Sequence, residues 1–406
     1  METEAEVGGH HIIRSNVLEP AGWYRSLRAQ CPVRKDEGYD PPFYVLSRYS
    51  DIDKAVRETD LWVNRDGPGL AFAGQGVLQS ADGDDHRRHR ATVTQAFTSP
   101  AMRRLEPRVL EIVAALFDGF ATVGEGDWIA LLAKPFPAVV IAEILGVSPD
   151  TREEFAAASA EVVAAFGDGD VARYQAAASI LRAQISFVLD KRLAALEGRT
   201  PDGGEPAPDL PDDVSTMLAV AHRRGELSYE EMVGIGTNLL IGGHETTTNL
   251  LALMVFRLAT RPDLLERVRA DRSLIETVVE ESLRFDSPTQ GMFRTSARDT
   301  EVGGVEIPAG AKVELLFASA NRDEDMWEDP EEFRIDRNPR DLRRHLAFGR
   351  GIHLCIGAPL ARMEAAAMLS QLLDRFATLE LAGEPSLTPS FILRGFTRMP
   401  IRWTLA

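Results

Sequence analysis

The sequence has little cysteine and no long apolar run. Only Cys31 and Cys355 occur in 406 residues, so a disulfide framework is excluded and a reducing, cytoplasmic compartment is expected. No stretch reaches the roughly 18 consecutive apolar residues that suggest a membrane-spanning helix. The polar N-terminal segment METEAEVGGHHIIRSN also lacks the apolar core of a signal peptide. We therefore expect a soluble, intracellular protein without a membrane anchor.

Positive charge is scarce as well. The chain has 45 Lys and Arg against 62 Asp and Glu, a net charge of −17, which argues against nucleic acid as a partner. Basic residues nevertheless gather in 334–362, where seven arginines stand against two acids, Asp336 and Asp341. A solvated face with scattered counterions explains this stretch as well as a docking surface does.

The apolar pattern is mainly helical. Helices are expected over 101–120, over 153–196 with a break at 167–169, and after Pro359. A capping box at Ser228–Glu231 opens a run of about 30 residues to Thr260, on the order of 45 Å long and buried at its centre. A second capping box at Ser273–Glu276 starts a helix that ends near Phe285.

Strand signals are limited to 43–49 and to short segments within 300–320. The stretch 198–213 is rich in Pro, Gly and Asp, and fits either an interdomain linker or an acidic surface loop. The pattern as a whole predicts a mainly α fold with a small β portion and no internal repeat.

One cysteine lies in a glycine-rich run, FGRGIHLCIG, at 348–357. A zinc site needs about four clustered ligands, but only His345 and His353 accompany Cys355. An iron–sulfur cluster needs several cysteines. A single thiolate can still be the axial ligand of haem, because the porphyrin supplies the equatorial donors. A buried cysteine beside a turn is the plain structural alternative.

The glycines of this run fit a haem loop. Gly349 and Gly351 permit tight turns under a flat ring, Gly357 leaves room for the next helix, and a helix N-terminus stabilises a thiolate. The run resembles the haem loop of the cytochrome P-450 family, whose pattern Phe-x-x-Gly-x-His/Arg-x-Cys-x-Gly it matches at every fixed position. The resemblance implies haem b with Cys355 as the iron ligand, and cofactor contacts from Phe348, Gly349, His353 and Gly357.

The expected central helix contains a second unusual run, GGHETTTN, at 242–249. Adjacent glycines cost roughly 1 kcal/mol each relative to alanine in a helix, and the threonines offer hydroxyls to the backbone. A packing kink with a hydrogen-bonded acid is the plain interpretation. The run is similar to the family's oxygen-activation motif, Ala/Gly-Gly-x-Asp/Glu-Thr-Thr/Ser. The resemblance makes Thr246 the hydroxyl that hydrogen-bonds to oxygen and Glu245 the acid that feeds protons inward.

An i,i+3 pair, Glu281 and Arg284, follows in the next expected helix. Such pairs are worth only about 0.2–0.5 kcal/mol on a helix surface. The pair resembles the family's Glu-x-x-Arg, a structural ion pair completed by a downstream arginine. Glu332 stands where an arginine often precedes Phe333, so we assign the third position to Arg337.

The resemblance implies further residue sets. The haem propionates are expected to contact His86, Arg90, Arg294 and His353. The run DGPGLAFAGQG at 66–76 resembles the loop over the haem. Each expected pocket residue could equally be ordinary core, and the set is Phe72, Phe166, Leu239, Gly242, Met292, Phe293 and Ile392. This mostly apolar set favours an apolar or weakly polar substrate, with a terpenoid, steroid, polyketide or aromatic acid all open.

By resemblance, residues 1–406 form a single cytochrome P-450 fold with a long central helix and a haem-thiolate loop. The implied enzyme is a monomeric monooxygenase that hydroxylates a C–H bond with O2. Its electrons would come from a ferredoxin-type protein and its reductase, docked on Arg87, Arg88, Arg340, Arg343, Arg344 and Arg350. A peroxygenase of the same fold and a non-catalytic haem-thiolate gas-binding protein are the alternatives.

Overall fold

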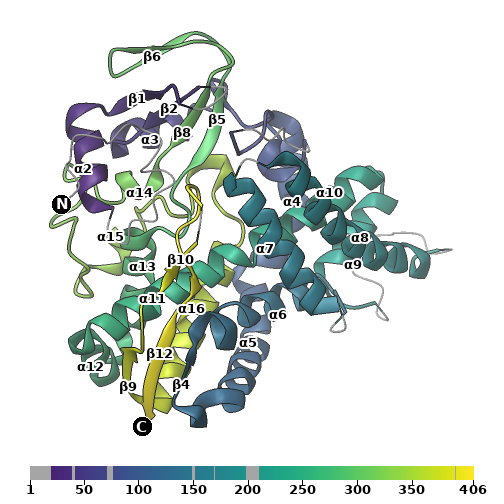
Figure 1. Cartoon of the computed structure of the whole chain (residues 1–406). Coiled ribbons are helices and arrows are strands. Elements are labelled where there is room, and N and C mark those ends of the chain that lie inside the picture. The colour runs from purple at the N-terminus through teal and green to yellow at the C-terminus, as the bar shows by residue number, and fades with distance from the viewer. Residues whose placement is uncertain are drawn as a thin grey trace.

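The computed structural model describes residues 20–38, 42–70, 76–148, 151–168, 170–197, 210–388 and 390–406. Helices dominate these ranges (Figure 1). The helices are α2 (Ala21–Gln30), α3 (Tyr49–Ala55), α4 (Gly83–Thr94), α5 (Ser99–Phe120), α6 (Pro135–Ile144), α7 (Arg152–Asp168), α8 (Val171–Ala195), α9 (Val214–Arg223), α10 (Tyr229–Gly242), α11 (Glu245–Thr260), α12 (Pro262–Ala270), α13 (Ile275–Asp286), α14 (Phe317–Ala320), α15 (Pro339–Leu342) and α16 (Ala358–Arg375). The expected mainly α class is confirmed.

The strands are short and form small sheets. They are β1 (Val33–Asp36), β2 (Phe43–Leu46), β3 (Trp62–Val63), β4 (Glu125–Asp127), β5 (Met292–Ser296), β6 (Thr300–Val302), β7 (Val305–Ile307), β8 (Lys312–Leu315), β9 (Phe376–Leu381), β10 (Ser386–Leu387), β11 (Phe396–Arg398) and β12 (Pro400–Leu405). The five-stranded sheet, ordered β1-β2-β8-β5-β3, lies at the upper left of Figure 1. The sheet β4-β12-β9 lies near the C-terminus at the bottom.

The main core lies among the helices. Its largest cluster of buried apolar side chains includes residues of α5, α6, α10, α11, α13 and α16, and smaller clusters pack against the five-stranded sheet. Helix α11 packs against both α13 and α16. The motifs found in the sequence are therefore carried on neighbouring helices. No helix in the described ranges is long and apolar enough to cross a bilayer.

The expectation of one continuous helix from 228 to 260 was wrong. The capping box at Ser228 forms, but α10 ends at Gly242 and α11 begins at Glu245. A Cβ added to Gly243 would lie 2.7 Å from Ile141 Cδ1, so the chain approaches α6 closely at this point. Gly243 and His244 form a turn between the two helices. Periodicity could not show this break because both helices are buried and apolar.

Other boundaries also differ from the expectations. The capping box at Ser273 was wrong, because Asp271 Oδ1 accepts from both the amide and the hydroxyl of Ser273 and α13 starts without a side-chain cap. Residues 317–320 form α14 rather than a strand. Several strands, including β1, β5 and β9–β12, carried no signal that we recognised. The first 19 residues and most of the stretch 198–213 lie outside the described residues.

Candidate functional site

The Cys355 loop depends on glycines with left-handed backbone. Gly349 has φ +65° and Gly351 has φ +72°, a region that favours glycine. A Cβ added to Gly351 would lie 2.6 Å from the carbonyl oxygen of Val56. The amide of Cys355 donates to the Phe348 carbonyl at 2.9 Å, which closes the loop. Gly357 has no such constraint, because its added Cβ would make an ordinary 3.9 Å contact with Cys355 Sγ.

The sulfur of Cys355 lies just before α16. Desolvation by the surrounding residues raises the pKa of the Cys355 thiol, although hydrogen bonds from the backbone at Gly357 and Ala358 lower it. The side chain nevertheless keeps exposed surface, so it faces a recess. A thiol of this kind becomes a thiolate when a metal cation displaces its proton. No group of three His, Cys, Asp or Glu in the described ranges could hold an ion.

Four basic side chains gather around this recess. Arg294 on β5 is 8% exposed, and burial lowers its pKa to about 10. The rings of His86 on α4 and His353 lie 4.2 Å apart. Arg90 lies close enough for its charge to help lower the pKa of both histidines. Asp82 is the acid of this cluster, 3.8 Å from His353 Nε2.

The cluster needs more negative charge than Asp82 supplies. Within the described ranges no carboxylate forms an ion pair with Arg90 or Arg294, and His86 Nδ1 and His353 Nε2 lack hydrogen-bond partners. A buried guanidinium such as that of Arg294 favours a bound carboxylate. The two propionates of haem meet this requirement, and the lone cysteine meets the requirement for an axial ligand. The residues therefore fit haem.

We expect Arg294→Met to weaken haem binding. The variant keeps the buried volume but removes a buried cation that pairs with a propionate. Removing one partner of a buried, hydrogen-bonded charge pair costs about 2–5 kcal/mol of binding free energy. The rate of haem transfer to apomyoglobin measures the loss. Arg298→Met, which changes an exposed arginine just after β5, serves as the control. Equal transfer rates for both variants would contradict the assignment of Arg294.

The acid–alcohol pair directly follows the break between α10 and α11. Thr246 Oγ1 donates to the Gly242 carbonyl at 2.9 Å, a bond that ties the hydroxyl to the end of α10. Burial raises the pKa of Glu245, and the charge of Lys134 partly opposes this. Glu245 Oε1 has no hydrogen-bond partner in the described part of the chain. The pair thus combines an acid that favours its neutral form with an adjacent hydroxyl.

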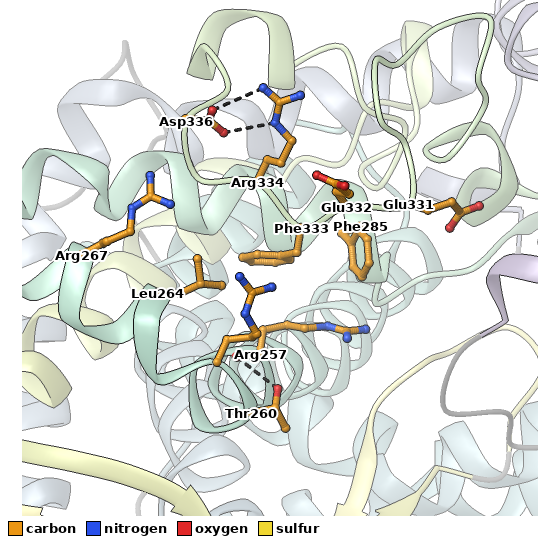
Figure 2. A pocket seen from close by; sticks show the side chains of 11 residues that line it. Arg257, Thr260, Leu264, Arg267, Phe285, Glu331, Glu332, Phe333, Arg334 and Asp336 are labelled. Carbon is orange, nitrogen blue, oxygen red and sulfur yellow. Dashed lines mark hydrogen bonds and ion pairs between the residues drawn. The ribbon is translucent and has the colours of Figure 1, made fainter.

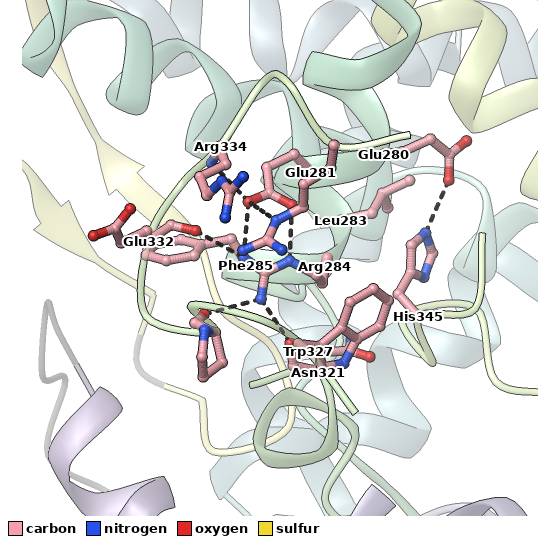
Figure 3. Close-up of polar contacts among 12 residues, drawn as sticks. Glu280, Glu281, Leu283, Arg284, Phe285, Asn321, Trp327, Glu332, Arg334 and His345 are labelled. Atoms are coloured by element: carbon pink, nitrogen blue, oxygen red, sulfur yellow. Dashed lines mark hydrogen bonds and ion pairs between the residues drawn. The ribbon is translucent and has the colours of Figure 1, made fainter. Parts of the chain in front are cut away.

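The predicted ion pair is fully buried (Figure 3). Arg284 donates to both carboxylate oxygens of Glu281 at 2.7 and 2.8 Å. Arg337 Nε lies 3.3 Å from Glu281 Oε1, so the third arginine reaches the pair. The amide of Arg334 also donates to Glu281, at 2.8 Å. Arg284 further donates to three carbonyls of the segment after α14, at Asn321, Pro330 and Glu332.

A neighbouring network was missed in the sequence. Glu280 accepts from His345 Nε2 and from Arg362 Nη2, each at 3.0 Å. Although burial acts to raise it, these hydrogen bonds lower the pKa of Glu280 to about 2. The Arg362 guanidinium also lies 4.7 Å from the centre of the Phe348 ring. This network links α13 to the Cys355 loop. The only available signal was the adjacency of Glu280 to Glu281.

The expected pocket residues fall into different environments. Gly242 is exposed, and an added Cβ would meet nothing within 4 Å. Leu239 is buried and Met292 is half-buried. Phe293 and Ile392 are buried in a core cluster, because alternate residues of β5 face opposite sides and Phe293 packs on Phe43. Their assignment to the pocket stays a prediction. Phe72 lies outside the described residues, and the side chain of Phe166 is not described.

The expected docking arginines are partly neutralised within the chain. Arg88 binds Asp85 and Glu231 and so holds α4 to the start of α10, which is a structural use. The remaining contacts are Arg87 with Asp84, Arg343 with Glu276, Arg350 with Asp53, and Arg344 with the sulfur of Met326. Arg340 is exposed. Ile352 and Leu354 beside Cys355 are also 44% and 45% exposed, so this surface is both basic and apolar.

A separate hollow of about 790 Å³ lies near the ion pair (Figure 2). Its walls come from the end of α11, α12, Phe285 and the segment 331–336. Three of its arginines already have acidic partners: Arg257 pairs with Asp286, Arg261 with Asp263, and Arg334 with Asp336. None of its lining residues belongs to the Cys355 loop, so we assign it no part in the chemistry.

The fold and this set of residues define a haem-thiolate protein. A mainly helical fold carries a lone cysteine before one helix and an acid–alcohol pair at the start of a neighbouring one. The chain belongs to the cytochrome P450 family, whose model matches residues 160–401. It is a monooxygenase of this family, and haem b is its cofactor.

Named relatives support this assignment. The chain is 37% identical to vitamin D(3) 25-hydroxylase of Pseudonocardia autotrophica, over 93% of this chain and 92% of that one. It is 35% identical to cyclomarin C epoxidase CymV of Salinispora arenicola, over 89% and 90%. Among solved structures, CYP109E1 from Bacillus megaterium in complex with testosterone matches with a TM-score of 0.84 and 30% identity, covering 94% and 97% of the two chains.

Proposed function

We propose that this cytochrome P450 hydroxylates an apolar small molecule with O2 and with electrons from a ferredoxin-type protein. The observation that carries the proposal is the Thr246–Gly242 hydrogen bond beside a buried, partnerless Glu245 oxygen. A peroxide-driven enzyme has no need of a proton supply, whereas reduction of O2 consumes protons. We further propose that residues 1–406 act as one domain, as a cytoplasmic monomer.

The proposed roles follow from the geometry. Haem held by a cysteine thiolate activates O2 for insertion of one oxygen atom into a C–H bond. Cys355 would be the axial ligand, and the loop of Phe348, Gly349 and Gly357 would shape its surroundings. His86, Arg90, Arg294 and His353 would hold the propionates. Glu245 would deliver protons past Thr246, whose hydroxyl is held ready by the Gly242 carbonyl.

An apolar substrate is supported by the side chains near the helix break. Gly242 leaves open space where a larger residue would project, and Leu239 on the same helix adds apolar surface. The relatives agree in kind, since one is named for vitamin D(3) and solved neighbours bind testosterone and corticosterone. Steroids and secosteroids are therefore the first compounds to test, with a shift of the haem spin state as the measure of binding.

The ferredoxin proposal rests on the basic and apolar surface beside Cys355. Arg340, Arg343 and Arg344 are exposed there with Ile352 and Leu354. Acidic partners are attracted by such a surface, and the attraction falls as salt rises. Arg88 and Arg350 pair with the half-buried acids Glu231 and Asp53, and Arg87 pairs with Asp84 on its own helix. We place the main attraction on Arg340, Arg343 and Arg344, of which Arg343 has only the exposed partner Glu276.

Turnover with O2, NAD(P)H, a ferredoxin and its reductase tests the function. We expect product formation from these components, and a fall of about 10²-fold in Glu245→Gln, because general acid catalysis contributes at least this much. Electron transfer should slow with added salt and in Arg343→Ala/Arg344→Ala, whereas Arg103→Ala/Arg104→Ala, which removes two exposed charges from α5, serves as a charge-matched control. Turnover with hydrogen peroxide alone at the same rate, unaffected by Glu245→Gln, would overturn the proposal.

A further inference from the structure

His244 lies in the break between α10 and α11 and has no role in the function described above. Its side chain is completely buried, and its ring lies 5.3 Å from that of Phe155 on α7. One ring nitrogen, Nε2, is 3.2 Å from the carbonyl oxygen of Lys134. Lys134 follows the π-helical segment Ile129–Ala133 and precedes α6. The imidazole therefore connects the helix break to a second distorted backbone segment.

The Lys134 carbonyl determines the tautomer of His244. A carbonyl oxygen only accepts hydrogen bonds, so Nε2 must carry the hydrogen. Burial lowers the pKa of His244 to about 3, and the ring is neutral at physiological pH. Nδ1 is then a bare acceptor. It has no hydrogen-bond partner among the described residues, and the nearest carboxyl oxygen is Glu245 Oε1 at 3.6 Å.

Glu245 presents the complementary atom. Its Oε1 is also buried and without a partner in the described ranges. A carboxylate facing the lone pair of Nδ1 would be repelled, whereas a protonated carboxyl can donate to it after a small side-chain rotation closes the 3.6 Å gap. The described charged group that acts on Glu245 is Lys134, from the turn before α6, and it opposes the effect of burial. Phe155 of α7 adds an uncharged ring.

We propose that His244 is a positioning residue that holds Glu245 in its protonated state between proton transfers. Nδ1 accepts the carboxyl O–H while Nε2–H is anchored on the Lys134 carbonyl. When the proton moves inward, the carboxyl O–H bond breaks and the resulting carboxylate leaves Nδ1. Solvent then reprotonates it, and the acid returns to His244. His244 itself neither gains nor loses a proton. The inference rests on the proposed function, because it deepens the role given there to Glu245.

The tautomer of His244 can be measured without turnover. Nitrogen-15 NMR of the histidine-labelled holoenzyme, reduced and bound to carbon monoxide so that it is diamagnetic, reports the protonation of each ring nitrogen. His244→Gln assigns the resonances by their loss. We expect a neutral ring with the hydrogen on Nε2 at neutral pH. A hydrogen on Nδ1, or a doubly protonated ring, would overturn the proposal.

The state of Glu245 is measured by infrared spectroscopy on the same complex. Photolysis of carbon monoxide gives a difference spectrum, and Glu245→Gln assigns the carboxyl band. In the wild type we expect the C=O stretching band of a protonated Glu245 carboxyl. This band should move to higher frequency in His244→Leu, because the hydrogen bond from the carboxyl to His244 is lost. His244→Gln, which keeps an acceptor, should restore part of the shift. His222→Leu is the control, because His222 on α9 bonds to the Leu227 carbonyl and not to a carboxyl group. An unchanged band in His244→Leu would overturn the proposal.

The coupling of NAD(P)H oxidation to product formation separates this inference from the proposed function. We expect His244→Leu to keep the thiolate-type Soret band with carbon monoxide but to release severalfold more hydrogen peroxide per NAD(P)H, with His244→Gln intermediate. Full coupling in His244→Leu would count against the positioning role alone. A wild-type protein that lacks the thiolate-type band would instead count against the proposed function.

Discussion

Cys355→Ala is expected to lose the red-shifted Soret band that the reduced, carbon monoxide-treated wild type shows. The band requires a thiolate opposite carbon monoxide, and no other side chain in the 348–357 loop supplies one. Monooxygenase turnover should be abolished with it, because thiolate donation favours O–O cleavage. The measurement is the absorbance difference between the reduced protein with and without carbon monoxide, recorded with haem content from the pyridine haemochrome.

The second cysteine of the chain provides a matched control for this prediction. Cys31 is exposed, and its sulfur lies 3.5 Å from the Val33 carbonyl, so Cys31→Ala should leave the band and turnover unchanged. Retention of haem with a shifted band in Cys355→Ala is expected if the propionate cluster still binds the porphyrin. A normal red-shifted band in Cys355→Ala would contradict the ligand assignment outright.

The sequence predicted the site best where local chemistry is unusual. A cysteine among glycines, followed by a helix start, has few structural explanations, and two of the glycines do adopt left-handed backbone. The acid and threonine after Gly243 are also unusual in a buried helix. By contrast, the break at His244 depends on the approach of Ile141 from α6, which is far away in sequence. Helical periodicity carries no information on such a contact.

Contacts between residues far apart in the chain also could not be predicted from the sequence. The network of Glu280, His345 and Arg362 joins residues up to 82 positions apart, and nothing local marks it. The sequence also does not say which face of β5 meets the core. Phe293 packs in a core cluster, whereas the neighbouring Arg294 belongs to the basic cluster. The strands of the C-terminal sheet were missed because their pairing partners, such as β4 for β12, are distant in the chain.

Glu281→Gln is expected to destabilise the protein by about 3–5 kcal/mol, the cost of removing one partner from a buried ion pair. Both side chains of the Glu281–Arg284 pair are fully buried. The variant leaves Arg284 charged with carbonyl oxygens as its remaining partners, and weakens the hold on the backbone of Arg334. Chemical unfolding followed by circular dichroism measures the change, and haem loss during expression is the expected cellular effect.

An exposed pair on the same helix gives the control. Glu276 meets Arg343 at 2.8 Å with more than half of each side chain exposed, so Glu276→Gln should cost about 1 kcal/mol or less. Arg337→Gln should fall between the two, since Arg337 adds one 3.3 Å contact to Glu281 while Arg284 keeps its bidentate bond. If Glu281→Gln cost no more than Glu276→Gln, the buried pair would not be what holds α13 to the segment that leads into the Cys355 loop.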